Sequence, residues 1–379
     1  MLKYTELKCT NRQNLIEVLP LRKPFTALIE PSSLCNFKCI QCFQSIKADS
    51  YFTRNRGNMP MTRFRRVIEQ LKAWPGPKLK VLKLSLYGEP LVNPHFCDML
   101  RVAREADVAE RIETTTNASL LFRDVAENLA ECQLDYARVS IYASDQAKHQ
   151  AVTGSGMEIG AIHGNLWVLQ EIKKNKGSEK PFVSCKMLDA YGDENERFIR
   201  TYQDVADEVF LDKPHGWIKV DGADFIKNYY KDDAYAAITD LKLNSTKRIA
   251  CPMAFTTMAV RSNGDVSPCC VDFIGGTNLG NVDERSLHEI WNSDQWCEFQ
   301  KMQLENRKHE NYSCSRCDIY LSDHYTRDNI DGFPVEKLRD DLGISWTGQN
   351  IILTANHKDV KDEKQENNQH YDWLPERGG

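Results

Sequence analysis

Along residues 25–211, segments in which apolar residues recur at every second position alternate with segments in which they recur at the helical period. Short runs such as Lys80–Tyr87 place an apolar side chain at roughly every second position, a pattern that predicts half-buried β-strands. The segments between such runs repeat apolar residues at the i, i+3, i+4, i+7 spacing of an amphipathic helix, first over residues 64–71. Strands that alternate strictly with helices predict a parallel sheet of the α/β class. Periodicity alone leaves a doubly wound sheet and a partial barrel open.

The expected elements are six strands and the helices between them. The strands are expected at residues 25–29, 80–87, 112–116, 136–142, 182–188 and 208–211. The helices are expected at residues 64–71, 96–103, 124–132, 159–174 and 194–205. In a parallel barrel the chemistry lies at the carboxyl ends of the strands. A cysteine loop, Gly88-Glu89, Asn117 and Tyr142 fall at these ends.

Three cysteines follow the first expected strand at the spacing C-x3-C-x2-C: Cys35, Cys39 and Cys42. Thiolates are soft ligands that favour iron–sulfur clusters, zinc or copper(I). A structural zinc site has four protein ligands, and no fourth Cys or His lies nearby in the sequence. A [4Fe–4S] cluster held by only three cysteines keeps one iron open to another ligand. On spacing alone, a zinc site and three unrelated thiols remain alternatives.

This loop resembles the cluster loop of the radical S-adenosylmethionine (SAM) superfamily. The resemblance implies a partial (β/α)6 TIM barrel whose open iron chelates the amino and carboxylate groups of SAM. It also implies that the reduced cluster cleaves SAM to a 5′-deoxyadenosyl radical, with a flavodoxin- or ferredoxin-type protein as electron donor. Gln41 departs from the many members that carry an aromatic residue before the third cysteine.

In this family the SAM contacts come from the ends of the second, third and fourth strands. Residues 87–90, Tyr-Gly-Glu-Pro, look like the family's Gly-Gly-Glu element, which binds the SAM ammonium group. Glycine permits close backbone approach, and an ammonium group needs oxygen acceptors. The resemblance carries SAM binding onto Gly88, Glu89, Thr116, Asn117 and Ser140. Threonine is also simply a favourable strand residue, so a plain structural interpretation of Thr116 stays open.

A second group of cysteines comprises Cys251, Cys269, Cys314 and Cys317. Two β-prone arms around Asn263-Gly264 predict a hairpin that brings the first two together, and residues 286–291 predict a capped helix. Two cysteine pairs suit zinc equally well. The series C-x12-G-x4-C, Gly-Asn-Val, Glu-Ile-Trp and C-x2-C is similar to the SPASM/Twitch domains of radical SAM proteins. Because no C-x5-C-x3-C series follows Cys317, the resemblance implies the Twitch type, with one auxiliary [4Fe–4S] cluster on these four cysteines. Cys270 is the rival of Cys269 as a ligand.

Composition and charge limit the expected partners and cellular location of the protein. A formal net charge of -5 and a pI near 6.0 argue against a nucleic-acid partner. The N-terminus lacks the pattern of a signal peptide, and no run approaches the ~18 apolar residues of a membrane span. With 13 cysteines, the chain is therefore expected to be cytoplasmic, to bind metal rather than form disulfides, and to have no membrane partner.

The 379 residues exceed one average domain, and the motifs divide them. The expected parts are an N-terminal extension at 1–24, the radical SAM partial barrel at 25–213, a bridging segment at 214–250, the Twitch/SPASM-like domain at 251–320 and a C-terminal extension at 321–379. The bridging segment is expected to include a helix at the barrel mouth. The end of the C-terminal extension is expected to be disordered.

A fully ligated auxiliary cluster has no open iron for a substrate, so we expect it to accept an electron. The expected protein is a dehydrogenase-like radical SAM oxidoreductase that converts a sugar or cyclitol alcohol to a ketone, similar in layout to the 2-deoxy-scyllo-inosamine dehydrogenases. A base must take the alcohol proton, and the candidates are His215, Tyr142 and Asp189.

Other functions remain alternatives to this oxidation. One is radical modification of a ribosomal peptide or protein side chain, and another is epimerisation with Cys185 or Cys270 as hydrogen-atom donor. A non-catalytic electron carrier is disfavoured by the open-iron loop and Gly88-Glu89.

Overall fold

The computed structural model describes residues 14–46, 50–190, 192–212, 218–220, 224–230, 248–319 and 328–339. Its first part contains the strands β1 (Thr26–Ile29), β2 (Leu79–Leu84), β3 (Ala109–Thr116), β4 (Tyr136–Ser140), β5 (Phe182–Leu188) and β6 (Glu208–Asp212). Neighbours in the sequence are neighbours in the sheet, and every such pair is parallel. A doubly wound sheet reverses its strand order at a switch point, so this unbroken order is that of a partial (β/α)6 barrel.

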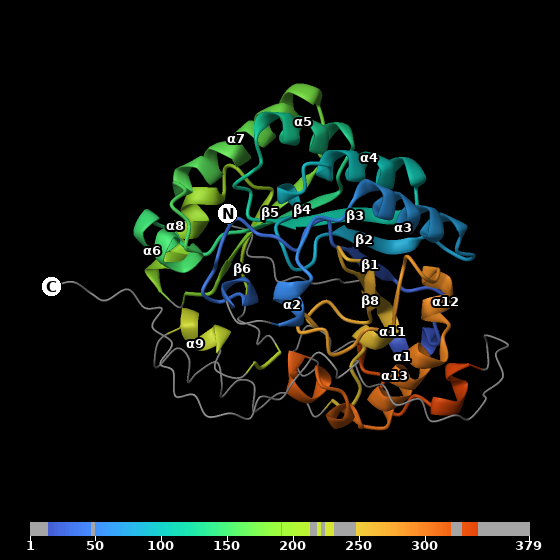
Figure 1. The fold of residues 1–379 in the computed structure, drawn as a ribbon. Helices are drawn as coiled ribbons and strands as arrows, with labels where there is room; N and C mark the ends of the chain where they lie inside the picture. The colour runs from blue at the N-terminus through green and yellow to red at the C-terminus, as the bar shows by residue number, and fades with distance from the viewer. Residues whose placement is uncertain are drawn as a thin grey trace.

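Helices that follow these strands cover the outer side of the sheet (Figure 1). They are α3 (Met61–Ala73), α4 (Phe96–Ala106), α5 (Arg123–Glu131), α7 (Ile159–Lys176) and α8 (Asp193–Tyr202). In α3 the buried residues are Phe64, Val67, Ile68 and Leu71, as the helical period predicts. The period does not predict a further helix, α6 (Gln146–Thr153), because two of its three buried residues are His149 and Thr153 rather than apolar residues.

The two faces of each barrel strand carry different residues. In β4, Ala137 and Val139 are buried in the hydrophobic core, whereas Arg138 and Ser140 lie on the opposite face and are half-buried. The same alternation holds over residues 82–84 of β2 and 112–116 of β3. We call this second, inner face of the sheet the lumen face.

The second part of the chain continues the same sheet. Strand β7 (Thr257–Val260) pairs in parallel with β1, and β8 (Asp265–Ser267) and β9 (Gly280–Asn281) follow in antiparallel pairs. The predicted hairpin around Asn263-Gly264 is confirmed, with Gly264 at a φ of +94° in the turn, a conformation that favours glycine. The remaining described helices are α1 (Leu15–Val18), α2 (Tyr51–Arg54), α9 (Phe225–Tyr229), α11 (Met253–Thr256), α12 (Leu287–Trp291) and α13 (Asp294–Leu304). The predicted capped helix is α12, which begins with a capping box of Ser286 and Glu289.

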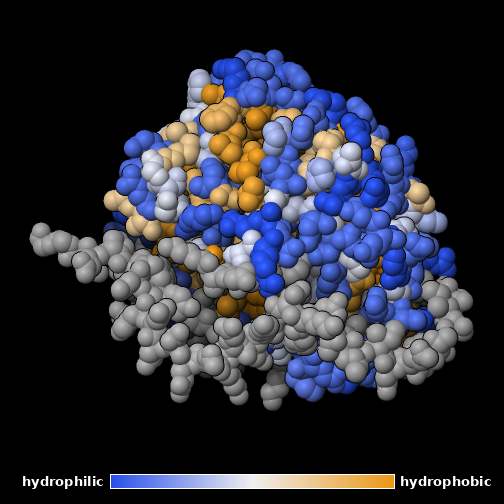
Figure 2. All heavy atoms as spheres, viewed as in Figure 1, coloured by the Kyte–Doolittle hydropathy of each residue, from blue (hydrophilic) through white to orange (hydrophobic). Residues whose placement is uncertain are grey.

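The face drawn in Figure 2 is mainly hydrophilic over the outer helices, with a smaller hydrophobic area among them. Within the described residues, no helix combines the length and the apolar character that crossing a membrane requires. The predicted base His215 lies outside the described residues, as do residues 340–379, which include the end of the C-terminal extension that is predicted to be disordered from about residue 356.

A buried carboxylate joins the two parts of the sheet at the end of β1. Glu30 is 1% exposed. Its Oε1 accepts a hydrogen bond from the Tyr87 N–H at 3.2 Å, and its Oε2 accepts one from the Ser262 N–H at 2.9 Å. Burial raises the pKa of Glu30, although the Ser262 N–H favours the ionised form. Because Tyr87 follows β2 and Ser262 closely follows β7, one side chain ties together the ends of the three central strands.

We predict that Glu30→Ala destabilises the folded protein, because the N–H groups of Tyr87 and Ser262 lose their buried acceptor. Two unsatisfied donors cost about 2–4 kcal/mol of unfolding free energy, measured by urea denaturation of the cluster-loaded protein. Glu30→Gln, which keeps one acceptor oxygen, should lose less. The control is Glu110→Ala, which removes an exposed carboxylate paired with the exposed Lys80 and should change the free energy by less than about 1 kcal/mol. Equal losses in the Glu30 and Glu110 variants would contradict the prediction.

Candidate active site

The loop with the first three cysteines follows β1 at the carboxyl end of the barrel strands. Cys39 is buried, and Cys35 and Cys42 are half-buried. Burial raises the pKa of all three thiols, that of Cys42 to about 12, and the charges of Cys42 and Cys35 also raise the pKa of Cys39. Free thiols here stay protonated near neutral pH. Only a positively charged partner such as a metal stabilises three thiolates in this position.

The helix α6 holds one side of this loop. The Lys38 N–H donates to the Thr153 carbonyl at 2.8 Å, and the Ile40 N–H donates to the Val152 carbonyl at 2.9 Å. Both acceptors are at the end of α6, so the helix that the sequence period misses positions the cysteine loop.

Gly88 holds the other side of the loop. A Cβ atom at Gly88 would lie 2.3 Å from the Ser32 carbonyl oxygen and 2.4 Å from that of Leu34. The next residue, Glu89, donates its N–H to the Leu34 carbonyl at 2.8 Å. The absence of a side chain at Gly88 therefore allows the end of β2 to pack directly on the segment that leads into Cys35.

Glu89 joins the ends of β2 and β3. Its Oε1 accepts from the Thr116 hydroxyl at 2.6 Å, and its Oε2 accepts from the Asn117 N–H at 2.7 Å. Burial raises the pKa of Glu89 to about 7, and these hydrogen bonds oppose that rise. A nearby cation, such as an ammonium group, stabilises the ionised form of such a carboxylate.

The Asn117 side chain connects this network to the cysteine loop. Its Nδ2 donates to Asn36 Oδ1 at 3.0 Å, Asn36 Nδ2 donates to the Ser119 hydroxyl at 2.7 Å, and that hydroxyl donates to Asn117 Oδ1 at 2.6 Å. The structure therefore brings Gly88, Glu89, Thr116 and Asn117 together beside the cysteine loop. Sequence reasoning missed Asn36 and Ser119, whose only signal is a polar side chain inside the loop or just after a strand end.

Two of the predicted bases lie at the ends of β4 and β5, next to α9. The Tyr229 hydroxyl donates to the Tyr142 carbonyl at 3.0 Å, and the Tyr230 hydroxyl donates to the Asp189 carbonyl at 2.8 Å. Burial, with the nearby loop thiols, raises the pKa of Tyr142, and interaction with the Ser140 side chain opposes this rise. A raised pKa favours Tyr142 as a hydrogen-bond donor rather than as a base. Asp189 Oδ1 accepts from Asn195 Nδ2 at 2.7 Å.

The second group of cysteines surrounds one cavity. The cavity has about 450 Å³ of empty volume, including space open to solvent, and its lining contains Cys251, Cys269, Cys314 and Cys317. Burial raises the pKa of each of these thiols, that of Cys317 to about 12, and the charge of Cys251 contributes to the rise at Cys269, Cys314 and Cys317. Two donors point at sulfur: Gln303 Nε2 lies 3.4 Å from Cys314 Sγ, and the Val271 N–H lies 3.4 Å from Cys269 Sγ. Four desolvated thiols around one space are a donor set that fits an iron–sulfur cluster.

The thiols are spread apart rather than gathered at a single point. In the described part of the chain, no group of three or more His, Cys, Asp or Glu side chains stands where one metal ion would bind. A zinc ion needs its four sulfurs about 2.3 Å from one centre. In a [4Fe–4S] cluster each thiolate binds a different iron, so the sulfurs stand further apart.

An aromatic cluster lies between the two cysteine groups. Phe43 and Phe273 stack with ring centroids 4.5 Å apart and an angle of 12° between their planes. The same buried cluster is in contact with Cys42 of the first group and with Cys269 and Cys317 of the second. The two groups therefore share one apolar, water-poor boundary.

The structure separates the two cysteines that sequence analysis considers as hydrogen-atom donors. Cys185 of β5 is 0% exposed and belongs to the hydrophobic core under the helices, not to the lumen face. Cys270 is half-buried and is absent from the lining of the cavity. Burial raises the pKa of Cys270 to about 11, and the charge of Lys83, a lumen-face residue, opposes this rise. Of the two thiols, Cys270 is therefore the one near the lumen.

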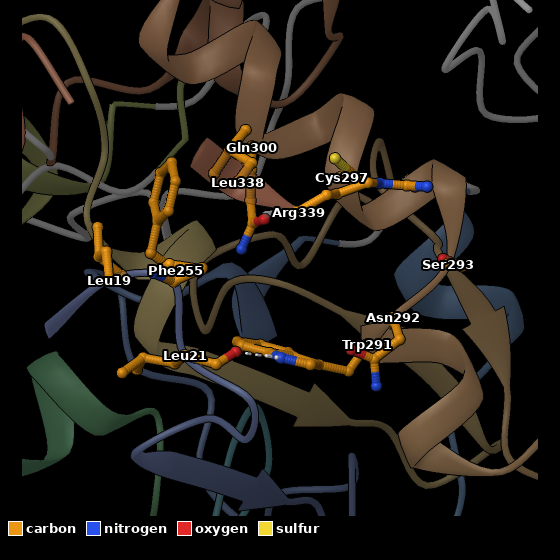
Figure 3. A pocket seen from close by; sticks show the side chains of 11 residues that line it. Leu19, Leu21, Phe255, Trp291, Asn292, Ser293, Cys297, Gln300, Leu338 and Arg339 are labelled. Carbon is orange, nitrogen blue, oxygen red and sulfur yellow. Dashed lines mark hydrogen bonds between the residues drawn. The ribbon is translucent and has the colours of Figure 1, made fainter. Parts of the chain in front are cut away.

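A separate pocket lies between residues 19–21 and the helices α11, α12 and α13 (Figure 3). Trp291 Nε1 donates to the Leu21 carbonyl across it at 3.0 Å. Arg339 lines the pocket and pairs with Asp294. None of the seven candidate ligand cysteines lines this pocket, so it is separate from the candidate metal sites.

Two family models match this chain. The model of the radical SAM superfamily matches residues 29–159, and the model of SPASM, an iron–sulfur cluster-binding domain, matches residues 251–318. The first match contains the C-x3-C-x2-C loop, and the second contains all four cysteines around the cavity.

Proteins similar to this chain include one curated relative and several solved structures. The chain is 24% identical to the tungsten-containing aldehyde ferredoxin oxidoreductase cofactor-modifying protein of Pyrococcus furiosus, over 77% of this chain and 86% of that protein. SuiB of Streptococcus suis bound to S-adenosylmethionine has a similar fold, with a TM-score of 0.56 and 18% identity over 80% of this chain and 74% of that chain. BtrN in complex with AdoMet and 2-DOIA has a TM-score of 0.48 and 17% identity over 78% of this chain and 93% of that chain. This last similarity is too low to bear on the reaction.

We predict that Gly88→Ala displaces the cysteine loop, because the added methyl group meets two backbone oxygens that have little freedom to move. The reconstituted variant should lose about half of its iron, the share of one of two [4Fe–4S] clusters, as measured by iron and sulfide content. The matched control is Gly57→Ala, where an added Cβ has no atom within 4 Å and iron content should not change. Full iron content in the Gly88 variant would rule out this role.

Proposed function

We propose that this chain, which carries a radical SAM domain and a SPASM domain, is an oxidoreductase that removes two electrons from a small polar substrate such as a sugar or cyclitol. The radical SAM domain binds a [4Fe–4S] cluster and SAM, and the SPASM domain binds an auxiliary iron–sulfur cluster. When bound, the first cluster and SAM would supply the radical chemistry that removes a hydrogen atom from the substrate, and the auxiliary cluster would supply a one-electron acceptor.

The ligand assignments follow from the two groups of thiols. Cys35, Cys39 and Cys42 would hold the first cluster and leave one iron open for SAM. Cys251, Cys269, Cys314 and Cys317 would hold the auxiliary cluster. The observation that carries the proposal is the single cavity shared by these four thiols, because four protein ligands leave a cluster suited to electron transfer rather than to substrate binding.

Several residues of this chain would bind SAM and orient it. Glu89 would accept a hydrogen bond from the SAM ammonium while it holds Thr116 and Asn117 in place. Ser140 and Tyr142 line the same end of the barrel and would contribute hydroxyl groups. Loss of the alcohol proton makes the substrate radical a stronger reductant, so a base is needed. Of the described candidates, Asp189 is the better base, because the pKa of Tyr142 is raised by burial.

One observation favours a second candidate function, epimerisation. Cys270 does not line the auxiliary cavity and lies within electrostatic reach of Lys83 on the lumen face. A thiol in this position would return a hydrogen atom to the substrate radical, with inversion at carbon and no net oxidation of the substrate. The thiyl radical left on Cys270 would take one electron from the ferredoxin- or flavodoxin-type reductant and one proton from solvent.

The test is anaerobic reconstitution with iron and sulfide, followed by SAM, a reductant and deuterated sugars or cyclitols. Deuterium in 5′-deoxyadenosine identifies the abstracted hydrogen. Ketone formed one-for-one with SAM consumed supports oxidation, whereas solvent deuterium in a product of inverted configuration supports epimerisation. Failure to cleave SAM at all would refute both functions.

We predict that Cys269→Ser and Cys270→Ser, which change adjacent thiols, have different effects. Cys269→Ser should lower the iron content from about eight to about four per chain, because it removes one ligand of the auxiliary cluster. It should abolish ketone formation while SAM cleavage continues. Cys270→Ser should keep about eight irons and full oxidation, and its loss of activity would instead support epimerisation. Equal iron contents in the two variants would contradict the assignment of Cys269.

A further inference from the structure

Among the described residues, Lys83 and Arg138 are lumen-face cations that form no ion pair. Lys83 is on β2 between Leu82 and Leu84, which are both 0% exposed in the core, so its side chain is on the opposite, lumen face. Arg138 alternates in the same way between Ala137 and Val139 on β4. In the portion of the chain that the structure describes, no carboxylate lies within 4 Å of Lys83 or Arg138.

The carboxylates of the lumen face have other partners. Glu113 forms an ion pair with Arg111, Asp212 pairs with Lys186 at 2.7 Å, and Glu208 accepts a hydrogen bond from Ser184 at 2.5 Å. The lumen face therefore holds a local excess of positive charge around Lys83 and Arg138.

The lowered pKa of Lys83 is due in part to this excess of positive charge. Burial, together with repulsion by Arg138 and Lys186, lowers the pKa of Lys83 to about 8, although Glu113 and the Cys270 thiol act in the opposite direction. The Arg138 guanidinium lies over the ring of Phe210, 5.7 Å from its centroid. An aromatic face interacts favourably with a cation but does not neutralise its charge.

Two hydroxyl groups near these cations have no hydrogen-bond partner. Ser85 is two residues beyond Lys83 on the same chain segment and is 3% exposed, and Thr115 of β3 is paired in register with Arg138. Ser85 Oγ and Thr115 Oγ1 are buried and unsatisfied among the described residues. Buried polar atoms without partners are costly, so this group of side chains is arranged for a ligand.

We propose that Lys83 and Arg138 bind an anionic group of the substrate, a carboxylate or a phosphate, with the hydroxyls of Ser85 and Thr115 as additional donors. This inference rests on the proposed function for the identity of the lumen as the substrate site. It adds that the substrate is an acidic molecule, such as a sugar acid or a sugar phosphate, rather than a neutral polyol.

The SAM carboxylate is the other source of negative charge in a site of this kind. The position of Lys83 argues against it. Lys83 pairs in register with Leu28 of β1, before the strand end that leads to the cysteine loop. The thiol with which it interacts is Cys270, next to the auxiliary ligand Cys269, and not one of the three loop thiols. Lys83 is therefore on the lumen face, before the strand end and within electrostatic reach of Cys270, rather than at the cysteine loop that would hold SAM.

The test uses the reconstituted full chain and inorganic phosphate as the probe, titrated calorimetrically without oxygen at constant ionic strength. Lys83→Met and Arg138→Met should each weaken phosphate binding at least tenfold, as expected for loss of a hydrogen bond to a charged group. Lys83→Arg, which keeps the charge, should retain binding within about threefold. Lys80→Met, which removes an exposed lysine from the same strand, should have no effect. Iron content checks that each variant is folded.

The outcomes separate this proposal from the proposed function. SAM affinity and SAM cleavage, measured in the same variants, should not change. If Lys83→Met weakens SAM binding and leaves phosphate binding intact, the two cations hold the SAM carboxylate and the inference is wrong. The inference is also wrong if the wild-type protein does not bind phosphate. It is equally wrong if Lys83→Met binds phosphate as tightly as the wild-type protein does. Failure of the wild-type protein to cleave SAM refutes the proposed function, while the phosphate titration still decides whether Lys83 and Arg138 form an anion site.

Discussion

The short strand β1 belongs to both parts of the sheet, and this determines how the rest of the molecule is arranged. One edge of β1 pairs with β2 of the barrel, and the other edge pairs with β7 of the second part, so both parts belong to one nine-stranded sheet. Glu30 then binds N–H groups that follow both flanking strands. Because hydrogen-bonded strands keep a spacing of about 4.8 Å, the separation of the two cysteine groups follows from sheet geometry rather than from a flexible linker. The proposed transfer of an electron from the substrate to the auxiliary cluster would require such a constant separation.

Burial of thiols makes metal binding and local stability parts of the same equilibrium. Each candidate ligand has a raised pKa because burial disfavours the thiolate, and neighbouring thiols add to this effect. Iron supplies the positive charge that makes the thiolates stable, so part of the binding free energy is spent on ionising the ligands. The donors from Gln303 and Val271 partly offset this cost at Cys314 and Cys269. The stacked pair of Phe43 and Phe273 keeps water away from the boundary between the groups.

Local patterns predicted the parts of the fold that depend on local forces. The six barrel strands, the helix α3 and the hairpin around Gly264 follow from side-chain period and turn chemistry. Contacts between distant residues had no such signal: Glu30 and Ser262 are 232 positions apart, and Glu89 and Asn117 are 28 apart. The helix α6 escaped prediction because it buries His149 and Thr153. The alternating run that contains Lys83 predicted a strand but not whether its polar face meets solvent or a barrel lumen.

The same electrostatic argument applies to the candidate ligand cysteines and to the lumen cations, with the signs of the charges reversed. Buried thiols are costly to ionise until a cation arrives, and the charge of the half-buried Lys83, whose pKa is lowered, is costly until an anion arrives. A protein without a ligand would be more stable with an apolar residue at this lumen position, because a desolvated charge without an ion-pair partner opposes folding. Departures from the most stable choice are expected where a site must bind something. The pairing of Glu113 with Arg111 and of Asp212 with Lys186 strengthens this argument, because each of these carboxylates is bound to another cation, and the pKa of Lys83 stays lowered although Glu113 opposes the shift.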